Sequence, residues 1–256
     1  MTRLIAIINQ KGGSGKTTTT VNLAAALGKQ DRRVLVVDLD PQASASSWLG
    51  IKDGGRVLLD VFTDGLAMSG LVQPTTAEGV EVIPSSSWLI GVEKALASEV
   101  GAESALHRGL AALEGPWQYI LIDCPPTLGI LTTNALVAAK EVLVPVECHV
   151  LGLGGLARLL QAVEVVRERL NPKLKLAGIL ACRVDMRTRH AQEVLEELRN
   201  RFGPLVYEAI IRENVRLAEC PSFGQPINRY DPFCYGAADY RKLASDVMKQ
   251  ERQFPA

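Results

Sequence analysis

Short apolar runs rich in β-branched residues alternate with longer amphipathic segments along most of the chain. Runs that are apolar throughout are typical of strands buried on both faces of a parallel sheet, and the segments between them are long enough to form crossover helices. The predicted strands span residues 3–9, 32–40, 80–86, 119–126, 141–147, 175–185 and 204–211. The pattern therefore predicts an α/β protein with a mostly parallel twisted sheet and helices on both faces.

Helical periodicity predicts helices over residues 17–29, 154–170, 188–202 and 236–250, and a helical region from the third strand to about residue 113. The segment 44–76 has several glycines and weak periodicity, so we expect a mobile surface region there. No repeat and no low-complexity linker interrupts the alternation. We therefore expect residues 1–256 to form a single domain.

The charge balance, the apolar runs and the cysteines limit which classes of function the protein can have. Lys and Arg number 28, as do Asp and Glu, so contact with nucleic acid would require a local basic patch. No apolar run reaches the roughly 18–20 residues of a membrane-spanning helix, and the first predicted strand starts too early for a signal peptide. The five cysteines show no Cys-x-x-Cys spacing. Reduced, mostly packed thiols in a cytoplasmic protein are the expected state.

The stretch INQKGGSGKTTTT, residues 8–20, joins the first predicted strand to the first predicted helix. It resembles the phosphate-binding template G-x-x-x-x-G-K-[ST], except that Gln10 stands at the first glycine of the template and a lysine, Lys11, follows it directly. We expect Lys16 on the β- and γ-phosphates, the Thr17 hydroxyl on Mg²⁺ and Thr18 near the α-phosphate. The residues expected to contact the nucleotide in this loop are Lys11, Gly12, Gly13, Ser14, Gly15, Lys16, Thr17 and Thr18. A glycine turn that merely caps a helix is the alternative.

Three aspartates follow predicted strands. Asp38 and Asp40 end the second strand, and Asp123 ends the fourth. The carboxyl ends of parallel strands meet at the edge where ligands bind, so these carboxylates would lie beside the loop. We expect Asp123 to hold Mg²⁺ through water, Asp40 to orient an attacking water, and Asp38 to hold the magnesium shell or the neighbouring loops. Helix capping is the alternative for each aspartate taken alone.

Four stretches, NQKGGSGKTTTTVNLAAAL, VLVVDLDPQASAS, YILIDCPPTLGILTTNAL and NVRLAECPSFGQPINRYDP, resemble the ParA/Soj family of partition ATPases. These are deviant Walker A proteins, related to MinD and more distantly to nitrogenase iron protein. The resemblance covers nearly the whole chain and is weakest over residues 50–80. It implies a P-loop ATPase fold and the cofactors ATP and Mg²⁺.

The resemblance also gives Lys11 a role, where the residues alone left a solvated charge equally open. In this family the extra lysine reaches phosphates bound by the other subunit of a homodimer. The implied catalytic residues are Lys11, Lys16 and Asp40. Adenine would contact Asn214 and a backbone carbonyl of Arg212, where the family often has proline. No Asn-Lys-x-Asp motif for guanine is present.

Basic residues gather near the C-terminus. By resemblance, Arg187 and Arg216 match positions implicated in non-specific DNA binding, and we add Arg189. A solvated helix face is the alternative, and we favour it for Arg199 and Arg201. The implied function is partition of a chromosome or plasmid on the nucleoid, with a ParB-like partner that stimulates hydrolysis.

Two alternatives within the superfamily stay open. One is a positioning ATPase for a protein cargo, such as a chemoreceptor array or microcompartment. The other is a MinD-like membrane ATPase, which the modest apolar face of the last helix does not favour. A nitrogenase-type cluster would need Cys124 as a ligand, and we expect this cysteine to pack instead. We also expect His107, His149, Trp48, Trp88 and Trp117 to be structural.

Overall fold

The computed structural model describes residues 2–52, 54–55, 57–97, 99–148 and 150–252. The eight strands form one sheet in the order β3-β4-β2-β5-β1-β6-β7-β8. All pairs are parallel except β3 with β4. The strands are β1 (Arg3–Ile7), β2 (Val34–Asp38), β3 (Gln73–Pro74), β4 (Val80–Ile83), β5 (Tyr119–Asp123), β6 (Glu141–Glu147), β7 (Lys175–Val184) and β8 (Val206–Arg212). The predicted fold class and all predicted strands are confirmed.

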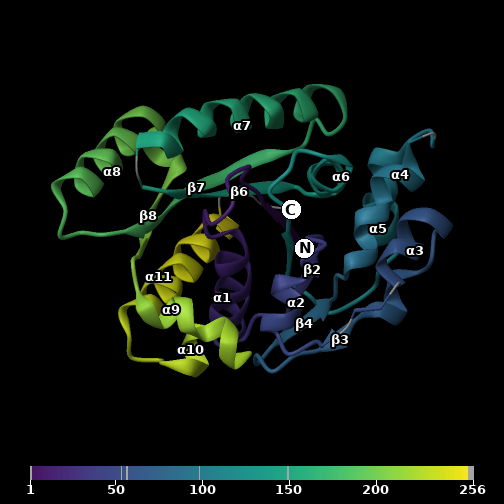
Figure 1. Ribbon diagram of the computed structural model, residues 1–256, viewed down its shortest axis with the longest axis horizontal. Helices are drawn as coiled ribbons and strands as arrows, with labels where there is room; N and C mark the ends of the chain where they lie inside the picture. The colour runs from purple at the N-terminus through teal and green to yellow at the C-terminus, as the bar shows by residue number, and fades with distance from the viewer. Residues whose placement is uncertain (1, 53, 56, 98, 149, 253–256) are drawn as a thin grey trace.

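Helices cover both faces of the sheet (Figure 1). One face carries α3 (Val57–Asp64), α4 (Val92–Leu96), α5 (Ala105–Ala111), α6 (Ile130–Ala138), α7 (Val150–Arg169) and α8 (Arg189–Phe202). The other carries α1 (Lys16–Gly28), α2 (Ser44–Trp48), α9 (Val215–Glu219), α10 (Ile227–Tyr230) and α11 (Tyr235–Lys249). Alternate residues of a strand enter opposite cores, so Ile5 packs with α1 while Ala6 packs with the α3–α8 side.

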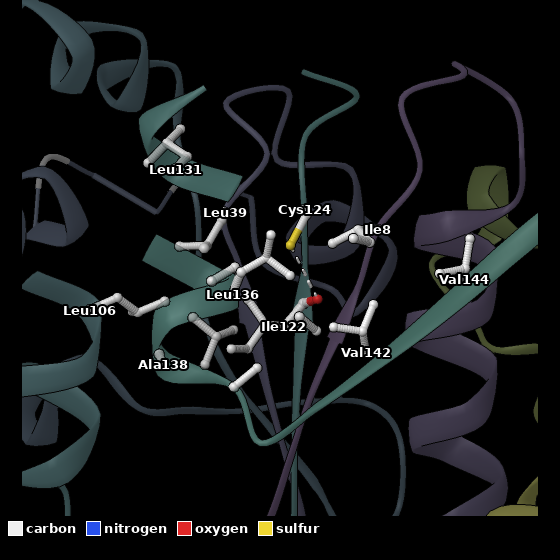
Figure 2. Packing of buried hydrophobic residues seen from close by; sticks show 14 of the residues in the cluster. Ile8, Leu39, Leu106, Ile122, Cys124, Leu131, Leu136, Ala138, Val142 and Val144 are labelled. Carbon is white, nitrogen blue, oxygen red and sulfur yellow. Dashed lines mark hydrogen bonds between the residues drawn. The ribbon is translucent and has the colours of Figure 1, made fainter. Parts of the chain in front are cut away.

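Cys124 lies in the core on the α3–α8 side, among Ile8, Leu39, Ile122 and Leu136 (Figure 2). Its side chain is fully buried, and its Sγ lies 3.7 Å from the carbonyl oxygen of Ile122. Burial raises the pKa of this thiol well above its usual value, with the nearby Asp123 carboxylate adding to the effect. Cys124 therefore packs as a small apolar residue, as the sequence indicated.

The segment 44–76 is more structured than the sequence suggested. It contains α2, α3, a 3₁₀ turn over Met68–Leu71 and strand β3. Its apolar side chains enter both cores, with Trp48 and Leu49 against α1 and Phe62 and Met68 on the opposite face. The prediction of a mobile surface region was wrong, because short elements bury apolar residues without a sustained period.

Smaller differences concern helices and one tryptophan. The helical region before residue 113 is broken, with Gly101 in the left-handed region between α4 and α5. Helices α6, α9 and α10 were not predicted. Trp48 and Trp117 are buried, whereas Trp88 is 55% exposed, so its assignment to packing was wrong. His149 lies outside the described residues.

The close approach of α1 to the loop before β4 gives a test of the packing. A Cβ on Gly28 would lie 2.0 Å from the backbone oxygen of Glu78, so Gly28→Ala should force the backbone apart. We expect the free energy of unfolding to fall by roughly 1–3 kcal/mol, measured by urea titration. Gly70→Ala, where a Cβ would meet nothing within 4 Å, should be near neutral. Equal stability of the two variants would contradict this packing.

Candidate nucleotide-binding site

The loop between β1 and α1 forms an open cradle. Gly13 and Gly15 have φ angles of +75° and +94°, a region that side chains with a Cβ rarely adopt. A Cβ added at Gly12 or Gly13 would meet nothing within 4 Å, so the backbone here faces free space. Gly15 also caps the N-terminus of α1, whose first N–H groups carry partial positive charge. This arrangement suits an anion with several oxygens.

Two polar side chains of the loop, those of Ser14 and Lys16, are buried. The Oγ atom of Ser14 is buried and has no hydrogen-bond partner among the described residues. The Lys16 amine is also mostly buried, and it donates to the Lys11 carbonyl at 3.4 Å. Burial lowers the pKa of Lys16, while the carboxylates of Asp123 and Asp40 act in the opposite direction. Of the two, Lys16 lines the cavity beside the glycine loop, and its amine fits the phosphates of a nucleotide.

Asp123 connects the sheet to helix α1. It ends β5, and its carboxylate accepts hydrogen bonds from the hydroxyls of Thr17 at 2.8 Å and Thr20 at 2.9 Å. It also pairs in register with Asp38 of β2. Burial raises the pKa of Asp123, and the nearby Asp38 raises it further, while the two threonine hydroxyls lower it. A divalent cation beside Thr17 and Asp123 would stabilise the ionised carboxylate, so this pair fits Mg²⁺.

Asp38 faces the loop that follows its strand. Its carboxylate accepts from the N–H and hydroxyl of Ser46 at 2.8 and 2.7 Å, and from the N–H of Asp40 at 3.1 Å. The Ser46 hydroxyl in turn accepts from the N–H of Ser85. Burial raises the pKa of Asp38, and the Ser46 contacts oppose that rise. Asp38 therefore holds the neighbouring loops, which is one of the two roles expected of it. Its contact with a magnesium shell stays a prediction.

Asp40 lies at the wall of the main cavity. Its carboxylate accepts from the N–H of Gln42 at 3.0 Å, and its carbonyl accepts from the hydroxyl of Ser85 at 2.7 Å. The cavity encloses about 920 Å³ and is lined by the glycine loop, Lys16, Thr17, Thr18 and Asp40 on one side. Arg187, Arg212 and Asn214 also line it. The cavity therefore unites the predicted phosphate, water-orienting and adenine residues.

Lys11 is held within its own chain. Its Nζ lies 2.6 Å from Oε2 of Glu147, the last residue of β6, and its side chain is 42% exposed. Oε1 of the same carboxylate lies 3.1 Å from Arg183. The extra lysine thus stands at the surface beside the cradle, where a second molecule could reach it.

The two expected adenine residues are fixed by local contacts. Asn214 caps α9, where its Oδ1 accepts from the N–H of Arg216 at 2.8 Å. The Arg212 guanidinium forms an ion pair with Asp239 and lies over the Tyr235 ring at 4.4 Å from its centroid. The Arg212 side chain is therefore engaged with α11. The backbone carbonyl stays the predicted adenine contact.

The three arginines expected to bind DNA are exposed and have different partners. Arg187 is 87% exposed at its side chain and makes a two-pronged contact with Asp185. Arg216 pairs with Glu219 at 3.0 Å and lies 3.7 Å from Asp231. Arg189 is exposed at the first position of α8. Surface ion pairs of this kind are weak and can exchange for other anions.

Three residues of the site were not singled out from the sequence. Thr20, on the second turn of α1, shares Asp123 with Thr17. Its spacing of three residues from Thr17 on a helix was a usable signal. Ser46 and Glu147 gave no local signal, because Asp38 lies eight positions before Ser46 across an irregular loop and Lys11 lies 136 positions before Glu147.

Comparisons with known proteins place this geometry in context. Residues 2–176 match the family described as an AAA domain. The chromosome partitioning protein ParA of Myxococcus xanthus is 43% identical over 251 residues, which cover 97% of this chain and 89% of that protein. The sporulation initiation inhibitor protein Soj of Bacillus subtilis is 44% identical over 249 residues, covering 96% and 98%.

Solved structures agree with the fold. Cobyrinic acid a,c-diamide synthase from Mycobacterium smegmatis, with bound ADP and magnesium, superimposes with a TM-score of 0.86 at 35% identity, covering 98% of this chain and 96% of that one. The septum site-determining protein MinD of Pyrococcus horikoshii, complexed with Mg-ADP, superimposes with a TM-score of 0.79 at 28% identity, and the match covers 97% of both chains.

Among the described residues, none of the helices combines the length and the apolar character needed to span a membrane.

The paired threonines on Asp123 generate a prediction. Thr20→Val removes one of the two hydroxyl donors while keeping the side-chain shape. We expect the Mg²⁺ concentration for half-maximal nucleotide binding to rise by about 10- to 100-fold, because partners of a metal ligand fix its orientation. Thr19→Val, equally buried but with its hydroxyl 3.4 Å from Tyr240, should leave that concentration unchanged. A Thr20→Val protein with unaltered Mg²⁺ dependence would contradict the role given to Thr20.

Proposed function

Because this chain belongs to the ParA/Soj family of partition ATPases, we propose that it partitions DNA through a nucleotide-dependent dimer. It binds ATP with Mg²⁺, dimerises, coats DNA without sequence preference and leaves it after hydrolysis. Hydrolysis is slow alone and is stimulated by a ParB-like protein bound to a centromere-like site. The cargo is a chromosome or a plasmid, and the site of action is the nucleoid in the cytoplasm.

The observation that carries the ATPase assignment is the meeting of the cradle, Lys16 and Asp40 in one cavity of about 920 Å³. The bound Mg²⁺ would neutralise phosphate charge, held by Thr17 and, through water, by Asp123. Lys16 supplies a buried positive charge to the phosphates. Asp40 stands on the cavity wall, where its carboxylate can orient a water for attack on the terminal phosphate.

The dimer is supported by the position of Lys11. A cation at the surface beside the cradle can contact phosphates bound by a second subunit, while Lys16 contacts those of its own. The negative charge of a triphosphate is then neutralised from both subunits only when they face each other. A contact that exists only with ATP bound supplies the differential affinity a switch requires.

DNA binding is supported by the exposure of Arg187, Arg189 and Arg216. Phosphate contacts alone suffice for binding without sequence preference, and such binding falls steeply with salt. One molecule offers few such contacts, and a dimer doubles them. Because the two sets of contacts are linked in the dimer, binding of the first raises the effective concentration of the second. DNA affinity then depends on ATP, since ATP is required for the dimer.

Charge reversal at Arg216 tests this assignment. We expect Arg216→Glu to weaken DNA binding in ATP by about tenfold or more, since it removes one phosphate contact per subunit and adds a repulsive charge. Arg216→Gln should give a smaller loss. The measurement is fluorescence anisotropy of a labelled duplex, with the dimer verified by sedimentation.

Arg201→Glu is the matched control, because Arg201 is also an exposed arginine of the C-terminal region and we assign it to a solvated face. It should bind DNA nearly as the parent does. Full DNA binding by Arg216→Glu, or an equal loss in Arg201→Glu, would remove Arg216 from the interface.

A further inference from the structure

The segment from Ile8 to Lys11 runs beside strand β6 and contacts it at successive positions. The N–H of Ile8 donates to the carbonyl of Leu143 at 3.2 Å, and the Asn9 amide donates to the carbonyl of Pro145 at 2.6 Å. The Lys11 amine reaches Glu147 at the end of the same strand. The N–H of Lys11 is bonded to Oδ1 of Asn9 at 3.0 Å. The start of the cradle is therefore fixed against β6, and its extra lysine is directed to the Glu147 carboxylate.

Glu147 contacts a second cation with its other oxygen. Oε1 lies 3.1 Å from Arg183, whose φ angle of +53° is uncommon for a residue other than glycine. Arg183 also lines the nucleotide cavity, and it lies 4.0 Å from Glu213. The Glu147 side chain is only 15% exposed, so one shielded carboxylate faces two cations at the rim of the site.

We propose that Glu147 is an intramolecular latch that holds Lys11 in its own subunit and must release it before the ATP-bound dimer can close. This inference rests on the proposed nucleotide-dependent dimer and adds to it a residue that sets how readily the dimer forms. A phosphate of the opposite subunit's nucleotide competes with the Glu147 carboxylate for the same amine. The stronger the intramolecular pair, the higher the protein concentration needed for dimerisation.

Arg183 makes the release possible at low cost. A shielded carboxylate that loses its only cation is strongly destabilised, whereas one that keeps a second cation is not. When Lys11 leaves, Arg183 is already in contact with Glu147 through the other oxygen. The shared carboxylate therefore allows an exchange of partners.

The test of the latch is the dimerisation constant with a non-hydrolysable ATP analogue, measured by sedimentation equilibrium. Glu147→Gln keeps the side-chain shape and removes the competing charge, so the dimer should form at a concentration about two- to thirtyfold lower. The pair contributes little by itself because the lysine is partly exposed and the carboxylate keeps Arg183, and a symmetric dimer releases two such pairs. Glu213→Gln, which also removes a carboxylate beside Arg183, should leave dimerisation unchanged.

A double-mutant cycle separates the latch from a general effect of charge. Arg183→Gln should weaken dimerisation when Glu147 is present and have no such effect in the Glu147→Gln background. The nucleotide affinity of each variant is measured separately, since Arg183 lines the cavity. An unchanged or weaker dimer in Glu147→Gln overturns the latch, and so does an Arg183→Gln effect that is the same in both backgrounds.

Failure of the latch can be told apart from failure of the proposed function. Lys11→Ala should abolish the dimer in every background, because the contact across the interface is lost. If the parent protein dimerises, Lys11→Ala does not, and Glu147→Gln behaves as the parent, only the latch is wrong. If the parent stays monomeric with the ATP analogue, the proposed function is wrong.

Discussion

The bonds of Asp123 to helix α1 are the interaction on which the site depends. The carboxylate ends the central strand β5 and accepts from Thr17 and Thr20 of the first turns of α1. It therefore sets where the helix begins relative to the sheet, and so where the glycine cradle and Lys16 stand. Because it is fully buried next to Asp38, its charge is unfavourable until hydrogen bonds or a cation offset it. The two threonine hydroxyls offset part of the cost of burying this charge, and a bound cation would offset more of it.

The charges around the cradle are arranged for a polyanion. Lys16 is buried with carboxylates near but not in contact, and the Ser14 hydroxyl lacks a partner in the described part of the chain. Lys11, by contrast, is engaged with Glu147. Lys16 can thus bind phosphate within its own subunit, whereas Lys11 must first leave Glu147. That difference separates nucleotide binding from the proposed dimerisation, so the two steps can respond to different residues.

The sequence predicted the strands and the cradle because both are local in origin. Continuous apolar runs define buried strands, and the spacing of glycines, Lys16 and Thr17 defines the loop. The segment 44–76 could not be predicted in this way, because Trp48, Phe62 and Met68 are buried by contacts with distant elements. The pairing of Lys11 with Glu147 joins a residue of the loop after β1 to the last residue of β6, 136 positions further along the chain. Contacts of this kind follow from strand order, which the local pattern does not encode.

The central claim is that nucleotide state controls DNA binding through Lys11. The most direct measurement is the affinity of the purified protein for a non-specific duplex in ATP, in ADP and without nucleotide, across a salt series, beside Lys11→Ala. We expect binding in ATP alone, a steep loss at high salt and no binding by the variant. Equal binding in all nucleotide states, or ATP-dependent binding that persists in Lys11→Ala, would contradict the account.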